Sequence, residues 1–272
     1  MKRPMGLLLV VLISMLTWAQ TPDCASLTQQ ALEISGVTQE LDQMAQTIGS
    51  DDYLRQMAGG KADSADFKTV FEPTMRKNLD GPSLKKELLR RVVARCKPEQ
   101  MSQTIQEMQS PFVSRMLQLE AARYTPEGQE KIKKYMRIIQ IAPPPDSQLD
   151  SANAFDRKVG VTDFTVDYLF AVTRGMLKGE GAPDDVLTQM QEHRKQMKAQ
   201  IQGTILASIL MTYSGVSKPD LAKYGDELSS GSLKWYYDAV HQSFVEMLEQ
   251  RSEAIGQDIK AAALAKQTAK AD

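Results

Sequence analysis

The sequence predicts an all-α protein, a multi-helix bundle built from two related helical halves. Hydrophobic residues recur at intervals of three and four residues along most of the chain, which is the spacing of one helix face. No stretch alternates polar and apolar residues for long, as a half-buried strand would. The order of helix-start signals in the first half recurs in the second at an offset of about 120 residues, which indicates an internal repeat.

The first segment, residues 1–19, has the pattern of a secretory signal peptide. Lys2 and Arg3 precede an apolar run that is far shorter than the roughly 20 residues of a membrane span. Thr17 and Ala19 place small side chains at the −3 and −1 positions of a cleavage site. We expect cleavage after Ala19 and export to the periplasm or the cell exterior.

Both cysteines, Cys24 and Cys96, follow this segment and are predicted to enter an oxidising compartment. An even number of cysteines in an exported chain is usually paired. We therefore expect a disulfide between Cys24 and Cys96, and closing a loop of this length contributes roughly 4 kcal/mol through loss of chain entropy in the unfolded state. The alternative is a pair of free, buried thiols.

The charge balance argues against a nucleic-acid partner. The chain has 33 Lys and Arg against 34 Asp and Glu, and loss of Lys2 and Arg3 with the signal makes the mature protein slightly more acidic. Nucleic-acid-binding proteins concentrate positive charge instead. The mature chain of about 250 residues is long enough for one large domain or two small ones with hydrophobic cores.

Several helices carry explicit start signals. Ser110-Pro111 and Thr125-Pro126 each place a capping hydroxyl before a proline at the first helical position. Ser217 with Asp220 forms a variant of the capping box, in which Asp replaces the usual Glu. We therefore expect helices to begin directly after Ser110, Thr125 and Ser217.

The longest helices are predicted in the second half. One runs from Pro183 to Tyr213, and another follows Gly231. The end of the chain, Ala261 to Asp272, is rich in Ala and Lys and is expected to be a fraying helix or tail. The predicted inward stripes are Val186, Met190, Met197, Ile201, Ile205 and Ile209 in the first of these helices, and Leu233, Tyr236, Val240, Phe244, Met247 and Ile255 in the second.

A proline-rich linker at residues 142–151 is predicted to separate the halves, because consecutive prolines disfavour a helix. The first helical half is residues 20–141, and the second is residues 152–272 with its Ala- and Lys-rich tail. Gly36-Val37-Thr38 in the first half and Gly160-Val161-Thr162 in the second are each predicted to open a helix. This repetition predicts a tandem duplication.

A second repeated signal supports the same prediction. Lys97-Pro98-Glu99 and Lys218-Pro219-Asp220 each place a Lys-Pro-acidic sequence at a helix start. The halves are expected to pack across a pseudo-twofold interface that buries apolar residues such as Val92 and Ile209. The prolines from Pro143 to Pro145 are expected to be exposed.

Two segments carry a resemblance to a known family. The segment from Leu221 through Tyr224 and Leu228 to Ser230-Gly231-Ser232-Leu233-Lys234-Trp235-Tyr236-Tyr237 contains a leucine-rich turn, an aromatic residue and a helix junction. Tyr124-Thr125-Pro126-Glu127-Gly128-Gln129-Glu130-Lys131 contains a similar junction, and Ser110-Pro111 is a competing candidate. These segments resemble the exported bacterial family called domain of unknown function 2059. The resemblance implies an all-helical periplasmic or secreted protein, and it carries over no catalytic residue.

The sequence contains no pattern typical of a catalytic or metal site. Its two histidines, His193 and His241, lack the spacing of a zinc motif, and no nucleophile elbow or phosphate-binding loop is present. Met101 and Met108, like Met190 and Met197, share a helix face and could suggest copper(I), but methionine more often fills helical cores. We expect no cofactor and no metal.

One predicted helix is strongly basic on its outer face. Its inner stripe is Leu84, Leu88 and Val92, and the region around Lys86 and Arg90 could contact anionic lipid headgroups or acidic cell-wall polymers. The more common explanation of such a run is a solvated face. The basic residues of this helix are Lys85, Lys86, Arg90, Arg91, Arg95 and Lys97.

The leading functional hypothesis is an exported, non-catalytic interaction protein of the bacterial cell envelope, which recognises an envelope protein or peptide through a groove between helices. The alternative is a carrier of an apolar small molecule held between the two halves. A hydrolase that uses acidic residues is a third hypothesis. An exposed apolar groove would favour the first, an enclosed apolar cavity the second, and a cleft with facing carboxylates the third.

Overall fold

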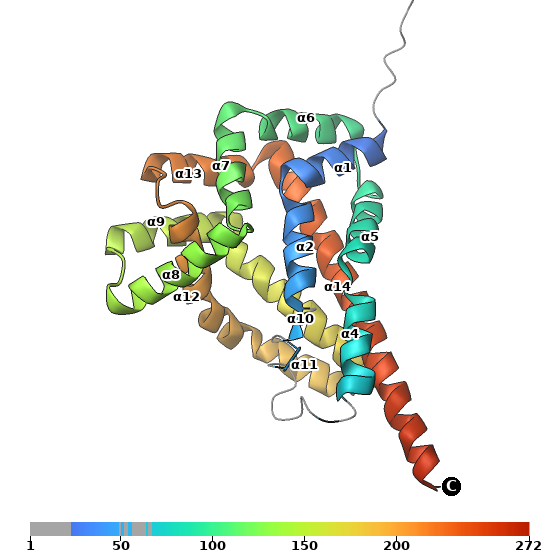
Figure 1. Ribbon diagram of the computed structural model, residues 1–272. Coiled ribbons are helices and arrows are strands. Elements are labelled where there is room, and N and C mark those ends of the chain that lie inside the picture. Colours follow the sequence, from blue (N-terminus) through green and yellow to red (C-terminus); the bar gives the residue numbers. More distant parts are fainter. Residues whose placement is uncertain (1–22, 49, 52–53, 56–63, 65–66, 272) are drawn as a thin grey trace, which may run out of the picture.

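The computed structural model confirms the all-α fold class (Figure 1). Within the part of the chain that the structure describes, every regular element is a helix and none is a strand. The predicted signal peptide and its cleavage site after Ala19 lie outside this part. The described residues are 23–48, 50–51, 54–55, 64 and 67–271.

The described helices divide between the two predicted halves. The first half contains α1 (Cys24–Ile34), α2 (Val37–Ile48), the π-helix η2 (Phe67–Phe71), α4 (Glu72–Asn78), α5 (Gly81–Val93), α6 (Pro98–Met108), α7 (Pro111–Ala122) and α8 (Pro126–Ile141). The second half contains α9 (Asp146–Val159), α10 (Val161–Glu180), α11 (Asp184–Glu192), α12 (Arg194–Thr212), α13 (Lys218–Leu228) and α14 (Gly231–Ala271).

The predicted helix starts are confirmed at three capping residues. The side chains of Ser110, Thr125 and Ser217 each accept a hydrogen bond from the backbone amide three residues further on. Each cap is followed by a proline in the first turn. A helix start leaves its first amide donors without partners inside the helix. The capping side chain accepts a hydrogen bond from one of them, and the proline has no amide hydrogen to satisfy.

Two glycines open helices at matching places in the halves. Gly36 has φ 76° and Gly160 has φ 82°, in the left-handed region that other residues rarely adopt. The helices α2 and α10 begin directly after them, as the sequence predicts. The glycines let the chain turn sharply from α1 into α2 and from α9 into α10.

The helix α14 runs through the core and packs against α10, α5 and α6 (Figure 1). It is continuous over 41 residues. The predicted tail is helical as far as Ala271 and projects beyond the other helices, with Leu264 exposed. The predicted inward stripe is confirmed, because all of its members are buried: Leu233, Tyr236, Val240, Phe244, Met247 and Ile255.

Glycines allow α10 and α14 to approach each other closely. A Cβ atom at Gly179 would collide with the carbonyl oxygen of Glu253, and one at Gly256 would collide with that of Met176. The two backbones are therefore in contact where side chains would otherwise hold them apart. This crossing makes α10 and α14 the most extensively packed helix pair among the described residues.

The prediction of a single helix from Pro183 to Tyr213 is wrong in one respect. The structure divides this segment into two helices, α11 and α12, at His193. Of the predicted stripe only Ile209 is fully buried, and Val186 is exposed. The stripe residues on α11 are not buried because α11 packs mainly against α12 and not against the core. Helical periodicity alone does not tell whether a partner lies against a stripe.

The link between the halves is shorter than predicted. The helix α9 begins at Asp146, so only residues 142–145 of the predicted linker at 142–151 are non-helical. Asp146 lies in the first turn, where a carboxylate interacts favourably with the helix dipole. Pro143 and Pro145 are exposed, as predicted, and Pro144 is half-buried.

Corresponding helices in the two halves have corresponding neighbours. The helix α1 packs against α2, α5 and α6, and α9 packs against α10, α12 and α13. The final helices instead cross over, since α14 packs on α5 and α6 while α8 packs on α12. Val92 and Ile209 are buried, as the duplication predicts. Among the described residues the first half has eight helices and the second has six. Part of this difference is that α7 and α8 stand where the second half has α14. The duplication itself stays a prediction.

The basic helix is α5, and its inner stripe of Leu84, Leu88 and Val92 is fully buried. Its basic side chains are mostly ion-paired. Three of them, and Arg95 just beyond the end of the helix, contact acids in the structure, which agrees with a solvated, paired face. These ion pairs are Lys85 with Asp42, Arg90 and Arg91 with Glu87, and Arg95 with Glu246. The peripheral contact around Lys86 and Arg90 stays a prediction.

Candidate functional site: a cavity between the two halves

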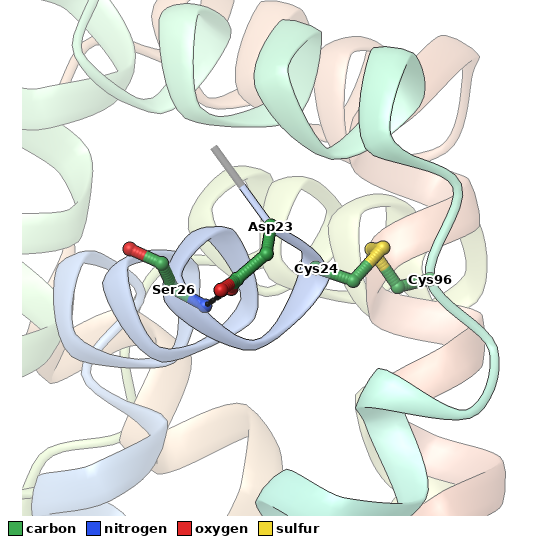
Figure 2. The surroundings of a disulfide bond; sticks show 4 residues. All are labelled: Asp23, Cys24, Ser26 and Cys96. Atoms are coloured by element: carbon green, nitrogen blue, oxygen red, sulfur yellow. Dashed lines mark hydrogen bonds between the residues drawn. A yellow bond between two sulfur atoms is a disulfide. The ribbon is translucent and has the colours of Figure 1, made fainter. Parts of the chain in front are cut away.

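The predicted cysteine pairing is found in the structure. Figure 2 shows Cys24 at the start of α1 bonded to Cys96, which lies in the connection between α5 and α6. Their Cα atoms are 5.9 Å apart, within the usual range for a disulfide. Beside the bridge, Asp23 caps α1 by accepting a hydrogen bond from the Ser26 amide at 2.7 Å. The role of this pair is to hold the start of α1 against the first-half core.

A cavity of about 520 Å³ lies between the two halves. Helices α2 and α7 line it from the first half, and α9, α10, α12 and α14 line it from the second. Most of its wall is apolar. Prominent apolar lining residues are Val37, Val159, Val161, Phe164, Ile205 and Phe244.

The entrance of the cavity is marked by exposed charged side chains. Glu40, Lys158, Lys234 and Asp238 all line the cavity and are exposed to solvent. Lys234 pairs with Asp238 at 2.6 Å, and Lys158 pairs with Asp226. The charges at the entrance are therefore largely balanced by one another.

The interior contains a carboxyl group, Glu120, at the end of α7. Its Oε1 atom accepts hydrogen bonds from the hydroxyls of Tyr224, at 3.1 Å, and Tyr213. Burial raises the pKa of Glu120, and the charge of Arg123 and the two tyrosine hydrogen bonds only partly offset that effect. The Glu120 side chain is thus biased toward its neutral form.

A guanidinium group lies next to this carboxyl in the α7–α8 junction. Arg123 donates to the Tyr124 hydroxyl and lies over the Tyr124 ring, with its Cζ atom 4.7 Å from the ring centroid. Among the described residues, no carboxylate oxygen lies within 4.0 Å of its nitrogen atoms, and its Nε has no hydrogen-bond partner. Arg123 is therefore an enclosed cation without a direct counter-ion.

The local sequence positions Arg123 and Tyr124 in this junction. The helix α7 ends at Ala122, and Thr125 caps α8 from the following residue. The side chain of Gln129 donates to the Arg123 carbonyl at 2.8 Å. Gly128 permits this tight arrangement, because a Cβ there would collide with the Ala122 carbonyl.

Aromatic side chains of α10 and one of the histidines, on α14, form another part of the cavity wall. The His241 ring lies 4.3 Å from the ring of Phe164 and 5.5 Å from that of Tyr168, measured between centroids. Its Nε2 atom is 3.3 Å from Asp167 without hydrogen-bond geometry. Burial lowers the pKa of His241, and the nearby carboxylates oppose that shift. His241 is therefore packed into the aromatic wall, while His193 is exposed between α11 and α12.

The described residues contain no group of three or more His, Cys, Asp or Glu side chains arranged to hold a metal ion. Met101 and Met108 are fully buried in the core, which agrees with their interpretation as core-filling residues. No helix in the described part of the chain is long and apolar enough to cross a membrane.

Comparison of the chain with models of protein families, with curated proteins and with solved structures finds no match. The resemblance to the domain of unknown function 2059 therefore stays a prediction.

The sequence analysis missed Glu120, Arg123 and Tyr124 as candidate site residues. No motif marks them, but a signal was present. Glu120 follows Val113 and Met116 at helical spacing, so it falls on the face of α7 that those residues bury. A charged residue on a predicted apolar face is the feature that could have identified the site.

Proposed function

We propose that this protein is an exported, non-catalytic binding protein of the cell envelope that carries a small, largely apolar molecule in the cavity between its halves. The observation that carries this proposal is the cavity itself. Its volume of about 520 Å³ falls within the range of roughly 300–1,000 Å³ that is typical of small-molecule sites.

The lining of the cavity supports an apolar ligand. Val37, Val161, Phe164 and Ile205 lie between helices yet keep accessible surface, because they face the cavity. A ligand that covers them removes apolar surface from water, which is favourable by roughly 25 cal/mol per Å². Glu120 and Arg123 are polar groups among this apolar lining, so they would orient the ligand.

The disulfide supports the exported location. Stable disulfides form in oxidising compartments and are rare in the cytosol. The structure brings Cys24 and Cys96 together as a bonded pair. Export to the periplasm or the cell exterior therefore fits the covalent structure.

Two other hypotheses are less favoured by this geometry. An interaction protein requires an exposed groove long enough for a peptide or helix, whereas this site is a cavity with a charged entrance. A hydrolase that uses acidic residues is favoured by one observation, since Glu40 and Glu120 both line the cavity. Glu40 is exposed at the entrance, however, and Glu120 is held inside by two tyrosine hydroxyls.

A matched pair of tryptophan variants tests the proposed function. Thr165 lines the cavity and Thr173 is exposed on the same helix, α10. Both threonine hydroxyls donate to the carbonyl four residues back, at 2.9 Å and 3.0 Å. We expect Thr165→Trp to fill the cavity and abolish binding of the neutral fluorescent probe N-phenyl-1-naphthylamine, whereas Thr173→Trp leaves binding unchanged.

Probe fluorescence in a titration of the purified protein measures this difference, and circular dichroism checks that both variants are folded. Equal binding by the two variants would place the probe outside the cavity. Failure of the unaltered protein to bind any apolar probe would overturn the proposed function.

A further inference from the structure

The enclosed end of the cavity has the features of an anion site. Arg123 keeps its positive charge at any physiological pH. A charge in such a place is normally paired, because removing it from water is expensive. Glu40 and Glu120 act on Arg123 only from beyond ion-pair distance, and Tyr124 is its one hydrogen-bond partner among the described residues.

The neighbouring carboxyl offers a second donor. Both tyrosine hydroxyls donate to Oε1 of Glu120, so a proton on this carboxyl resides on Oε2. A protonated Glu120 and the charged Arg123 would then both present hydrogen-bond donors to the same cavity. Such a pair suits an acceptor that carries one negative charge.

We propose that the cavity binds an amphiphilic monocarboxylate, whose carboxylate group is held by Arg123 and Glu120 while its hydrocarbon part lies along the apolar wall. This inference rests on the proposed function, because it names the ligand class of the same cavity. A guanidinium matches a carboxylate in shape and can bind it through two parallel hydrogen bonds. A phosphate dianion would need a second enclosed cation.

The other cations at the cavity do not provide that second charge. Lys158 and Lys234 are exposed at the entrance and are paired with Asp226 and Asp238. A cationic ligand is disfavoured by Arg123. A neutral ligand would fit the apolar wall but would leave the guanidinium without a counter-ion.

Ligands with one alkyl chain and different head groups test this inference. Displacement of N-phenyl-1-naphthylamine by dodecanoate, 1-dodecanol, dodecylammonium and dodecyl phosphate gives four affinities for the same protein. We expect dodecanoate to bind about 10- to 100-fold more tightly than 1-dodecanol, the usual worth of a hydrogen bond to a charged group. Dodecylammonium is expected to bind more weakly than 1-dodecanol.

Substitutions locate the selectivity. Arg123→Met should remove the preference for dodecanoate over 1-dodecanol and leave 1-dodecanol binding nearly unchanged. Glu120→Gln keeps a neutral donor and should retain the preference. The control is Arg115→Met, since Arg115 lies on α7 just before the junction that holds Arg123 but is exposed and pairs with Asp220 at 3.3 Å.

The outcomes separate this inference from the proposed function. If the protein binds the probe but dodecanoate and 1-dodecanol displace it equally well, the monocarboxylate inference is overturned. The proposed carrier function would not be affected by that result. Tighter binding of dodecyl phosphate than of dodecanoate would also overturn it. If Arg123→Met does not fold, the order of the four affinities in the unaltered protein still decides the question.

Discussion

The two halves of the molecule place different side chains at two matching positions of one cavity. When the sequence is aligned at the offset that places Ser110 on Ser230, Glu120 falls on Val240 and Tyr124 falls on Phe244. All four of these residues line the cavity. At these two positions the first half has a carboxyl and a phenol group, and the second half has an aliphatic and an aromatic side chain. Two halves with similar helix orders thus present different chemistry to the cavity at these positions.

The asymmetry also has a backbone cause. In the first half the chain leaves the helix after Ala122 and begins α8 at Pro126. In the second half α14 continues without interruption through the matching segment. The break places Arg123 and Tyr124 in a junction from which they reach the cavity. A short capping sequence, Thr125-Pro126, therefore accompanies the helix break in the first half that α14 lacks.

Each half is also stabilised internally in a different way. In the first half the Cys24–Cys96 disulfide fixes α1 next to α6. In the second half, α9 packs on α13 through Phe155, whose ring lies 5.4 Å from that of Tyr213 and 6.0 Å from that of Tyr224. A covalent bond thus stabilises one end and aromatic packing the other.

Removal of the covalent bond is expected to have the largest effect. The double substitution Cys24→Ser and Cys96→Ser should lower the free energy of unfolding by roughly 4 kcal/mol, because the unfolded chain regains the entropy of an open loop. Urea denaturation measures the change, and the reduced unaltered protein is the control. Equal stability of the oxidised, reduced and doubly substituted forms would show that non-covalent packing suffices in the first half as in the second.

The next largest effect is expected at the crossing of α10 and α14. Gly179→Ala should lower the free energy of unfolding by roughly 1–3 kcal/mol, because the new Cβ collides with the Glu253 carbonyl and forces the helices apart. Gly203→Ala is the control, since nothing lies within 4 Å of a Cβ there and alanine favours a helix. Urea denaturation of both variants measures the difference. A loss at Gly203 as large as that at Gly179 would contradict the close-packing explanation.

The smallest effect is a pH dependence of opposite sign in two carboxyl groups, one in each half. Burial raises the pKa of Glu120, so its contribution to stability is lost as the pH rises above the ordinary value of 4.5. Burial opposes the shift at Glu249, but Lys178 and Arg174 lower its pKa, so its contribution is present at neutral pH and lost in acid.

Glu120→Gln should therefore gain stability relative to the unaltered protein as the pH rises from 4.5, whereas Glu249→Gln should gain stability relative to the unaltered protein as the pH falls below 4.5. Free energies of unfolding from urea titrations at several pH values measure both trends. Matching trends in the two variants would show that Glu120 is not held in a neutral state by burial.

Local patterns predicted much of the fold. The caps at Ser110, Thr125 and Ser217 act within four residues of the chain, so their outcome did not depend on distant neighbours. The buried stripe of α14 followed from helical spacing for the same reason. The division of the Pro183–Tyr213 segment at His193 was not predicted. The apolar spacing suggests one continuous buried helix, but α11 has little to pack against besides α12.

The sequence by itself determined the helical class, the helix starts and the pairing of the only two cysteines, because spacing, capping and parity are properties of the chain. The tertiary structure alone decided where the cavity lies and which polar groups meet there. Glu120 on α7 receives its hydrogen bonds from Tyr213 and Tyr224, which are 93 and 104 residues away in sequence. Such a meeting depends on how the halves pack against each other, and no local rule of spacing or propensity encodes that arrangement.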